Sequence, residues 1–543
     1  MYVYALNKKA QVNDTGGAII MPTLEWIGKE KVINHHQQVP YRVLEEKYTY
    51  NAERSDNMII RGDNLEALKA LLPQFEGKVK CIYIDPPYNT GNEGWVYNDN
   101  VGDPKIKKWL GEVVGKEGED LSRHDKWLCM MYPRLKLLQK LLAEDGVIFI
   151  SIDDTEFHNL RAICNEVFGE NNFITTIIWH KNYAPKGTAR HFSEDHDYIL
   201  VYAKDGDKWV PNKMPRTEKQ NKAYKNYDND PRGLWRPNNL AARNFYSKGV
   251  YSITCPSGRV IPGPPAGSYW RVSEEKFWEM DRDGRIWWGK DGNNVPAPKI
   301  FLSEVSDGIV PQTLWEYEEV GHTQDAKKEI KRIFEGDTPF DTPKPYQLIE
   351  RILQIATNAE SIILDSFAGS GTTAHAVLNM NKADGGHRKF ILVEMMDYAD
   401  SITAERVKRV IDGYGEGKNA VEGTGGDFTF YDLGEVLLLP DGNLNENVSA
   451  DKIREYVYYM ETKEALPGSS NGNAYFMGNS RGTAYYFYYE KASITTLNHA
   501  FLATIPEKSE GYIIYADLCT IPPEELAKYN ITFKKIPRDI AKL

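Results

Sequence analysis

Two runs of alternating strand-like and helix-like segments, separated by a long irregular stretch, most constrain the fold of this chain. In the first run, apolar strand patterns at 58–60, 81–85 and 147–152 alternate with leucine-rich helical patterns. The same alternation returns in a second run at 345–411. Such alternation predicts parallel strands that are covered by helices on both faces. We therefore expect one doubly wound α/β domain that is split by an insertion.

The 543 residues exceed the size of one ordinary domain, and the patterns divide them into five segments. We expect an N-terminal extension, a first half of the α/β domain, an insertion, a second half of the domain and a C-terminal α+β module. Their predicted ranges are 1–50, 51–205, 206–325, 326–415 and 427–543.

Cysteine spacing and hydropathy exclude several classes of protein. The five cysteines are scattered and form no CxxC pair, so neither a disulfide framework nor a structural zinc site is expected. An 18-residue apolar run and a signal-peptide pattern are both missing, which predicts a cytoplasmic protein without a membrane partner.

Charge is distributed unevenly along the chain. The net charge of −11, averaged over the chain, argues against nucleic acid as a partner. Residues 209–271, however, hold eleven bases, three acids and nine aromatics, whereas 420–543 hold 11 bases and 17 acids. The basic stretch predicts a DNA-contacting surface, with a solvated loop face as the alternative. The acidic, tyrosine-rich end is interpreted as a subunit contact.

The first candidate site is Asp85-Pro86-Pro87-Tyr88, which ends an apolar strand pattern. Ligands of open α/β sheets bind outside the carboxyl ends of strands, so an acid there is available to a ligand. The two prolines remove N–H donors and leave carbonyl acceptors, and the tyrosine offers a flat face for stacking. These groups suit an exocyclic amino group on a planar base. A rigid turn with an incidental aromatic is the alternative.

The second candidate site spans 365–373, where a strand pattern meets a helix. Gly369 and Gly371 permit close approach of a ligand to the helix N-terminus. Glu394 ends the next strand, about 23 residues beyond Gly371, and an acid at that spacing can accept hydrogen bonds from ribose hydroxyls. The loop alone also permits a dinucleotide site, with Ala374 in place of a third glycine, and Glu394 could be a surface acid. A P-loop is excluded because GxxxxGK[ST] does not occur here.

Together the two sites resemble those of S-adenosylmethionine-dependent DNA adenine-N6 methyltransferases of the permuted, beta-class order, in which the catalytic loop precedes the cofactor loop. More closely, the chain resembles the modification subunit of Type III restriction–modification systems, over about residues 20–420. The strings that carry this resemblance are Asp85-Pro86-Pro87-Tyr88-Asn89-Thr90-Gly91, Glu194-Asp195-His196-Asp197-Tyr198-Ile199-Leu200-Val201-Tyr202-Ala203-Lys204, Thr342-Pro343-Lys344-Pro345 and Phe367-Ala368-Gly369-Ser370-Gly371-Thr372-Thr373-Ala374-His375-Ala376. Ser366 departs from the proline most often found there in the wider family.

The resemblance implies a Rossmann-like methyltransferase sheet with an inserted target-recognition domain, and methyl transfer from S-adenosylmethionine to adenine N6 in double-stranded DNA. A flipped-out adenine would then donate its amino hydrogens to Asp85 and to the Pro86 carbonyl and would stack on Tyr88. The resemblance assigns the methionine part of the cofactor to Lys344, Pro345, Asp365, Phe367, Ala368, Gly369, Ser370, Gly371 and Thr372. Glu394 would bind the ribose and Asp63 the cofactor's adenine, although Asp63 with Glu66 also forms a capping pattern. His196 and Asp197 are interpreted as structural.

The resemblance also implies partners: double-stranded DNA, a second copy of the chain and a restriction (helicase–nuclease) subunit, in a bacterial or archaeal cytoplasm. A stand-alone or Type II methyltransferase is the nearest alternative, and a neighbouring gene for a helicase–nuclease would separate the two. Cytosine-N4 methylation is disfavoured by Asp rather than Ser at position 85. A catalytically silent DNA-binding subunit is disfavoured by the two intact loops.

Overall fold

The computed structural model describes the chain at residues 10–12, 18–20, 23–90, 123–185, 187–305, 308–468, 472–506 and 508–542. Gly91 of the predicted catalytic string lies outside these residues. The chain divides into two compact units. One is the inserted segment Asn212–Pro311, and the other comprises Met1–Pro211 with Gln312–Leu543.

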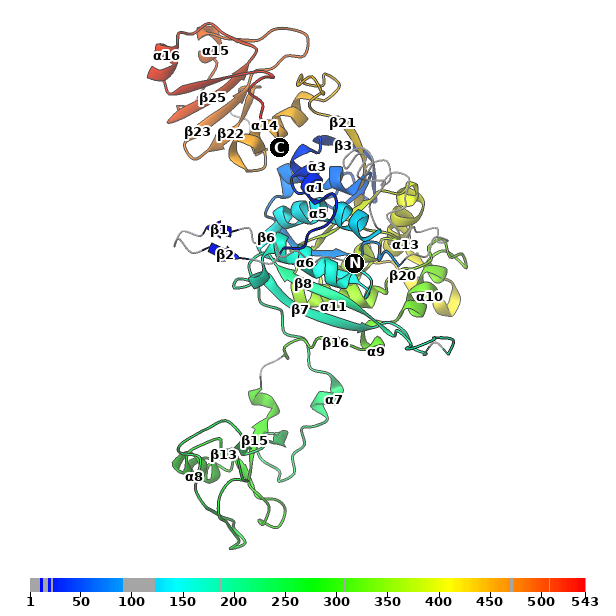
Figure 1. Cartoon of the computed structure of the whole chain (residues 1–543), viewed down its shortest axis with the longest axis vertical. Helices are drawn as coiled ribbons and strands as arrows, with labels where there is room; N and C mark the ends of the chain where they lie inside the picture. Colours follow the sequence, from blue (N-terminus) through cyan, green and yellow to red (C-terminus); the bar gives the residue numbers. More distant parts are fainter. Residues whose placement is uncertain are drawn as a thin grey trace. The chain divides into compact units, whose positions relative to one another are not determined.

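A ten-stranded sheet forms the centre of the larger unit (Figure 1). Its order is β16 (Leu314–Trp315), β7 (Phe173–His180), β8 (His196–Ala203), β6 (Leu142–Ile152), β5 (Val79–Ile84), β17 (Ile362–Asp365), β18 (Lys389–Glu394), β4 (Met58–Arg61), β21 (Phe428–Val436) and β3 (Arg42–Tyr50). The six strands from β6 to β21 are mutually parallel, as the alternation predicts. The sheet is mixed because β8 runs antiparallel to β6 and β7, and β3 runs antiparallel to β21.

Helices cover both faces of this sheet, which makes it doubly wound as predicted. The first group consists of α3 (Asn64–Phe75), α5 (Arg123–Leu141) and α6 (Phe157–Phe168), and its leucines pack with Ile82 and Ile84. The second group consists of α11 (Tyr346–Ala356), α12 (Thr372–Asp384) and α13 (Glu405–Asp412). Helix α5 accommodates Pro133 in its interior.

Strand β21 belongs to the central sheet, although the predicted boundary places it in the C-terminal module. The sequence assigned residues from 427 onward to a separate module, but β21 lies between β4 and β3 in the central sheet. Phe428 and Phe430 are buried there, at 0% and 2% exposure. The alternating apolar pattern of β21 indicates a strand without revealing which sheet it joins.

The inserted unit has its own small core of aromatic side chains. Its elements are α7 (Glu218–Asn221), β9 (Trp235–Pro237), β10 (Ala241–Ala242), β11 (Ile253–Thr254), β12 (Val260–Ile261), β13 (Tyr269–Trp270), α8 (Glu274–Arg282), β14 (Ile286–Trp287) and β15 (Ala297–Phe301). Trp270 packs with Phe277 and Trp288, and Trp235 is also fully buried. Several aromatics that the sequence interleaves with bases therefore stabilise the unit, whereas Phe245 is exposed.

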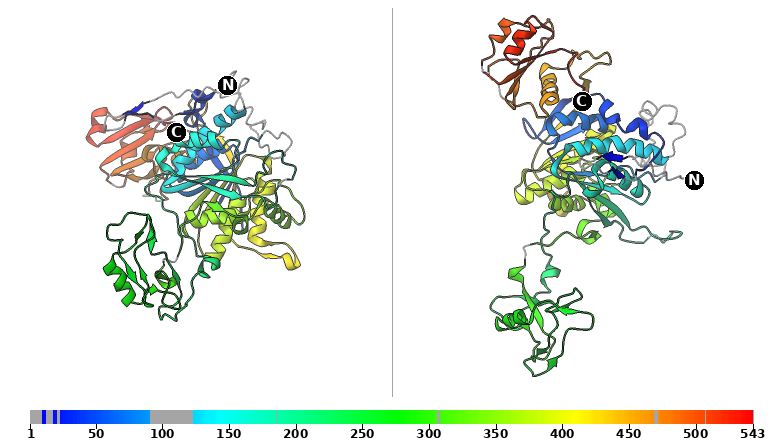
Figure 2. Two further views of the ribbon diagram at one scale, coloured as in Figure 1. Left: turned by 60° about the horizontal axis from the view of Figure 1, so that its bottom comes forward. Right: turned by 60° about the vertical axis from the view of Figure 1, so that its left-hand side comes forward.

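The C-terminal module contains a four-stranded sheet in the order β22 (Phe476–Ser480), β23 (Thr483–Phe487), β25 (Gly511–Ala516) and β27 (Ile531–Lys535), drawn in orange to red in Figure 2. Its helices are α14 (Ala450–Thr462), α15 (His499–Leu502) and α16 (Pro523–Lys528). The tyrosine-rich run is a strand, β23, whose side chains alternate between two cores. None of the helices within the described residues has the length and apolar character that a membrane crossing needs.

Smaller elements complete the larger unit. They are β1 (Ala10–Val12), β2 (Ala18–Ile20), α1 (Lys29–Val32), α2 (His35–Gln38), α9 (Tyr317–Val320), α10 (Thr323–Ile333), β19 (Gly413–Tyr414), β20 (Val421–Glu422), β24 (Thr496–Leu497) and β26 (Leu518–Cys519). The β19–β20 hairpin lies in a glycine-rich stretch of the chain.

Candidate active site

Four acidic residues lie at the carboxyl ends of four neighbouring parallel strands. Asp85 follows β5, Asp365 ends β17, Glu394 ends β18, and Asp63 comes two residues after β4. These strands are adjacent in the sheet in the order β5-β17-β18-β4, so the acids follow one edge. This is the edge at which open α/β sheets bind ligands. The structure thus brings together acids that the sequence places more than 300 positions apart.

Asp85 forms an ion pair with Lys344, from the segment just before α11. Burial raises the pKa of Asp85, and the Lys344 ammonium opposes that rise. The second carboxylate oxygen, Oδ1, is buried and accepts no hydrogen bond within the part of the chain that the structure describes. Asp85 therefore keeps one acceptor position for a ligand that supplies a donor.

Two side chains near the ends of β7 and β8 hold Tyr88 in place. The sequence analysis interprets one of them as structural and does not name the other. Its hydroxyl donates to Oδ2 of Asp197 at 3.3 Å, and the Lys181 ammonium lies 2.5 Å from Oδ1 of the same carboxylate. Asp197 is 3% exposed. Trp127 Nε1 donates to the Pro87 carbonyl at 2.6 Å, which fixes the loop from the side of α5. These bonds orient the Tyr88 ring at the rim of the site.

The glycine loop between β17 and α12 adopts a conformation that requires glycine. Gly369 and Gly371 have φ values of 51° and 81°, in the left-handed region. A Cβ on Gly371 would lie 3.0 Å from the Thr403 carbonyl oxygen. The amide of Gly369 donates to Glu394 Oε2 at 2.8 Å, and the Thr403 hydroxyl donates to the Gly369 carbonyl at 2.6 Å. The loop is therefore anchored on both sides.

Asp365 and Glu394 are both buried carboxyl groups. Asp365 accepts hydrogen bonds from the Thr373 hydroxyl at 2.6 Å and from the Phe367 amide at 3.0 Å. Burial raises the pKa of Asp365 to about 7, and it raises the pKa of Glu394 to about 7 as well. The Asp365 carboxylate adds to the rise for Glu394, and the Asp85 carboxylate adds to the rise for Asp365. Asp85 and Asp365 line one pocket, and Glu394 binds the Gly369 amide beside it, so this region favours a cationic ligand.

Asp63 caps the N-terminus of α3, as the sequence pattern suggests. Its Oδ1 accepts from the amides of Leu65 and Glu66 at 2.9 and 3.2 Å, and its Oδ2 lies 3.2 Å from Nη2 of Arg134. Arg134 also donates to the Asn64 side chain, whose amide reaches the Ser366 carbonyl at 3.3 Å. The capping role is confirmed, and contact of Asp63 with a cofactor stays a prediction.

The buried side chain of Arg406 binds residues of the glycine loop. The sequence analysis does not predict this role. It is 1% exposed, and its Nη1 donates to the hydroxyls of Ser370 and Thr372 at 2.8 and 2.7 Å. Its Nη2 lies 3.2 Å from Nδ1 of His375. Burial lowers the pKa of Arg406 to about 10, so the group is charged at neutral pH. The sequence places an arginine on an amphipathic helix, where a solvent-exposed position is the ordinary expectation.

One pocket joins the two predicted loops. Its lining includes Asp85, Lys344, Asp365, Phe367, Ala368, Gly369, Ser370 and Thr372, all of which the sequence analysis singles out. Thr372 also donates to the Lys344 carbonyl at 3.3 Å, and Pro345 is the N-cap of α11. The structure therefore brings the catalytic loop, the Lys344–Pro345 segment and the glycine loop to one place.

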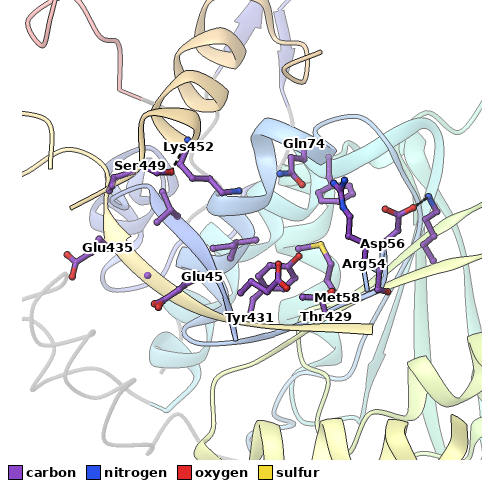
Figure 3. A pocket seen from close by; sticks show the side chains of 18 of the residues that line it. Glu45, Arg54, Asp56, Met58, Gln74, Thr429, Tyr431, Glu435, Ser449 and Lys452 are labelled. Carbon is purple, nitrogen blue, oxygen red and sulfur yellow. Dashed lines mark hydrogen bonds and ion pairs between the residues drawn. The ribbon is translucent and has the colours of Figure 1, made fainter. Parts of the chain in front are cut away.

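A second cavity, of about 850 Å³, lies at the opposite ends of the strands (Figure 3). Met58, Ile362 and Lys389, the first residues of β4, β17 and β18, line it, together with Ser449 and Lys452 at the start of α14. None of the predicted site residues is in its lining. Cavity size alone would therefore favour the wrong end of the strands, whereas the chemistry of the side chains identifies their carboxyl ends.

The doubly wound sheet and the site at its carboxyl edge are those of a Rossmann-like methyltransferase fold. A family model described as DNA methylase (N6 and N4 type) matches residues 79–405, and the chain belongs to this family. The matched segment contains the Asp85 loop, the inserted unit and the glycine loop.

Individual relatives support the assignment of the chain to this family. The StyLTI Mod subunit of a Type III restriction-modification enzyme from Salmonella typhimurium is 34% identical over 417 residues, which are 71% of this chain and 62% of that protein. The EcoPI Mod subunit of Escherichia phage P1 is 33% identical over 414 residues, 68% of this chain and 63% of that protein. The Type II methyltransferase M.KpnI of Klebsiella pneumoniae is 33% identical over 366 residues, 63% of this chain and 81% of that protein. The match thus spans less than two thirds of the two Mod subunits.

Proposed function

We propose that this protein is a site-specific DNA methyltransferase that transfers a methyl group from S-adenosylmethionine to the N6 amino group of adenine in double-stranded DNA. The observation that carries the proposal is the single pocket shared by the Asp85 loop and the glycine loop. One side of this pocket offers acceptors for an amino group, and the other offers a backbone cradle for a nucleoside cofactor. The family relationship supports the same reaction.

The residues present fit S-adenosylmethionine. Gly369 and Gly371 provide a close backbone approach, and the buried carboxyl groups of Asp365 and Glu394, with the partly exposed Asp85, favour a ligand with a positive charge. Asp365, Phe367, Ala368, Ser370, Thr372, Lys344 and Pro345 would hold the methionine part, Glu394 the ribose and Asp63 the adenine. When bound, this cofactor supplies an electrophilic methyl group on a sulfonium.

The catalytic loop would act on the adenine. The carboxylate of Asp85 accepts a hydrogen bond from the amino group through its buried Oδ1, and the Pro86 carbonyl accepts the second. These bonds draw the nitrogen lone pair out of conjugation with the ring. Tyr88, oriented by Asp197, stacks on the flipped base. The rate enhancement then comes from positioning and from electrostatics, without a covalent enzyme intermediate.

The partners follow from the same proposal. The inserted unit Asn212–Pro311 would contact DNA through its exposed bases, as a target-recognition domain. The chain would act as the modification subunit of a Type III system, with a restriction subunit and a second copy of itself as partners. A stand-alone or Type II enzyme is the second candidate, and the likeness to a Type II methyltransferase favours keeping it.

Asp85→Ala tests the reaction. We expect the variant to bind S-adenosylmethionine like the wild type in calorimetry and to lose methyl transfer to DNA. Asp145→Ala, at an exposed aspartate of β6, is the matched control and should retain both properties. Methylation by Asp85→Ala at the wild-type rate would refute the catalytic assignment.

Base-resolution mapping of DNA from cells that express the protein identifies the product. N6-methyladenine in a defined sequence is expected. Methylation on one strand only would favour the Type III assignment, and N4-methylcytosine would refute the choice of adenine.

A further inference from the structure

The connection between β7 and β8 carries the most exposed large apolar side chain in the described residues of this protein. Phe192 is 89% exposed, and its neighbours Arg190 and His191 are exposed as well. A phenylalanine in this position contributes almost nothing to the core. Single exposed apolar side chains are common on protein surfaces, so the position of Phe192 relative to the Asp85 loop is what distinguishes it.

The stem of this connection is fixed directly beside the catalytic loop. The Lys181 amide donates to the Asp195 carbonyl at 2.9 Å, and the Asn182 side chain donates to the Glu194 carbonyl at 2.9 Å. Lys181 then binds Asp197, which binds the Tyr88 hydroxyl. In Figure 1 the connection between β7 and β8 extends away from the end of the sheet.

Chain length sets how far Phe192 can be from the base-binding site. Phe192 precedes Asp197 by five positions, and a fully extended segment of that length spans at most about 18 Å. Because Asp197 binds the Tyr88 hydroxyl, Phe192 lies within about that distance of the residue on which the proposed target base stacks. The vacated position in the base stack is then accessible to a side chain on this connection.

We propose that Phe192 enters the DNA base stack at the position that the target adenine leaves, with Arg190 and His191 next to the phosphates on either side. A flipped base leaves an unstacked gap, and unstacking and unpairing oppose the flip. An apolar side chain inserted between base steps offsets part of that loss, while the Arg190 guanidinium pairs with a phosphate and His191 can hydrogen-bond to one. Phe192 is thus a positioning residue that favours the flipped state, and it does not touch the reacting atoms. This inference rests on the proposed DNA methyltransferase function.

The test compares Phe192→Ala with the wild type on two DNA substrates that contain the mapped target sequence. One is a fully paired duplex, and the other has the target adenine opposite an abasic site, which removes its pairing. We expect Phe192→Ala to methylate the paired duplex at least about tenfold more slowly, the size of one lost aromatic–base stack. On the unpaired substrate the difference should shrink to within about threefold, because the flip no longer needs assistance.

Two further measurements separate this role from a general structural one. With 2-aminopurine at the target position, the fluorescence gain on binding should fall in Phe192→Ala and persist in Phe192→Trp, which keeps an aromatic face. Tyr529→Ala, at a half-exposed aromatic of the C-terminal module, is the matched control and should leave both rates unchanged.

The outcomes are distinguishable from those that test the proposed function. If the wild type methylates neither substrate, the proposed function fails. If the wild type is active and Phe192→Ala is equally active on the paired duplex, the inference about Phe192 fails alone. An equal loss on both substrates would also overturn it, because it would indicate a defect in DNA binding or folding.

Discussion

Binding of S-adenosylmethionine should release protons and should strengthen as the pH rises from 6 to 8. The pKa values of Asp365 and Glu394 are raised to about 7, with burial as the largest cause. A sulfonium cation favours the ionised form of nearby carboxyl groups. The cofactor therefore competes with protons for this site, and the competition weakens as the pH increases.

The magnitude follows from the two pKa values. At pH 7 a group with a pKa of about 7 is half protonated, so two such groups together release about one proton per bound cofactor. From pH 6 to pH 8 each group contributes about tenfold to the affinity, and the pair about 100-fold. Each carboxyl group has a pKa above its unfolded value, so without ligand its stabilising contribution is present at low pH. That contribution is lost as the pH rises to about 7.

Calorimetry in two buffers of different ionisation enthalpy measures the proton release directly. S-adenosylhomocysteine has the same amino and carboxyl groups without the sulfonium charge, so it should show a weaker pH dependence. Asp365→Asn should remove about half of the released protons, whereas Glu360→Gln, an exposed acid before β17, should not change them. An affinity that is constant from pH 6 to 8, with no proton release at pH 7, would refute the reasoning.

Three further predictions concern the support of the site. Arg406→Met should weaken cofactor binding by about tenfold in calorimetry, because the buried hydroxyls of Ser370 and Thr372 lose their hydrogen-bond donor. An unchanged affinity would contradict the supporting role of Arg406. Gly371→Ala should lower the melting temperature through a loss of about 1–2 kcal/mol, because a Cβ meets the left-handed conformation and the Thr403 carbonyl; an unaltered melting curve would argue against it. A truncation after residue 426 removes β21, so circular dichroism should show an unfolded protein. A truncation after residue 439 keeps β21 and should retain the central sheet. Equal folding of the two truncated proteins would disprove the role of β21.

The parts of the site that the sequence predicts are those encoded by contiguous residues. Strand β18 ends at Glu394, as predicted, because a short apolar run that ends in an acid is complete in itself. The glycine loop is predictable for the same reason, since Gly369 and Gly371 mark a turn that needs positive φ. The family resemblance assigns both local patterns to a single reaction, and the match to the DNA methylase family agrees with that assignment.

The parts that the sequence leaves open depend on contacts between distant segments. Arg406 and Asp197 are charged residues on regular elements, and neither the period nor the spacing reveals that their side chains are buried. Arg406 is predictable as part of the site only once α13 is known to pack beside α12. The same holds for β21, whose pattern fits any sheet with a free edge.

The positions of the aromatic and basic residues show why composition alone predicts a DNA-contacting surface only coarsely. Trp235 and Trp270, in the basic stretch, are buried in the inserted unit and unavailable to a base. Phe192 lies outside that stretch, in a segment with no marked excess of charge, and is fully available. A count over a window sums side chains that stabilise a core with those that face solvent. Exposure near the Asp85 loop, rather than the density of charge along the chain, is therefore what distinguishes the β7–β8 connection.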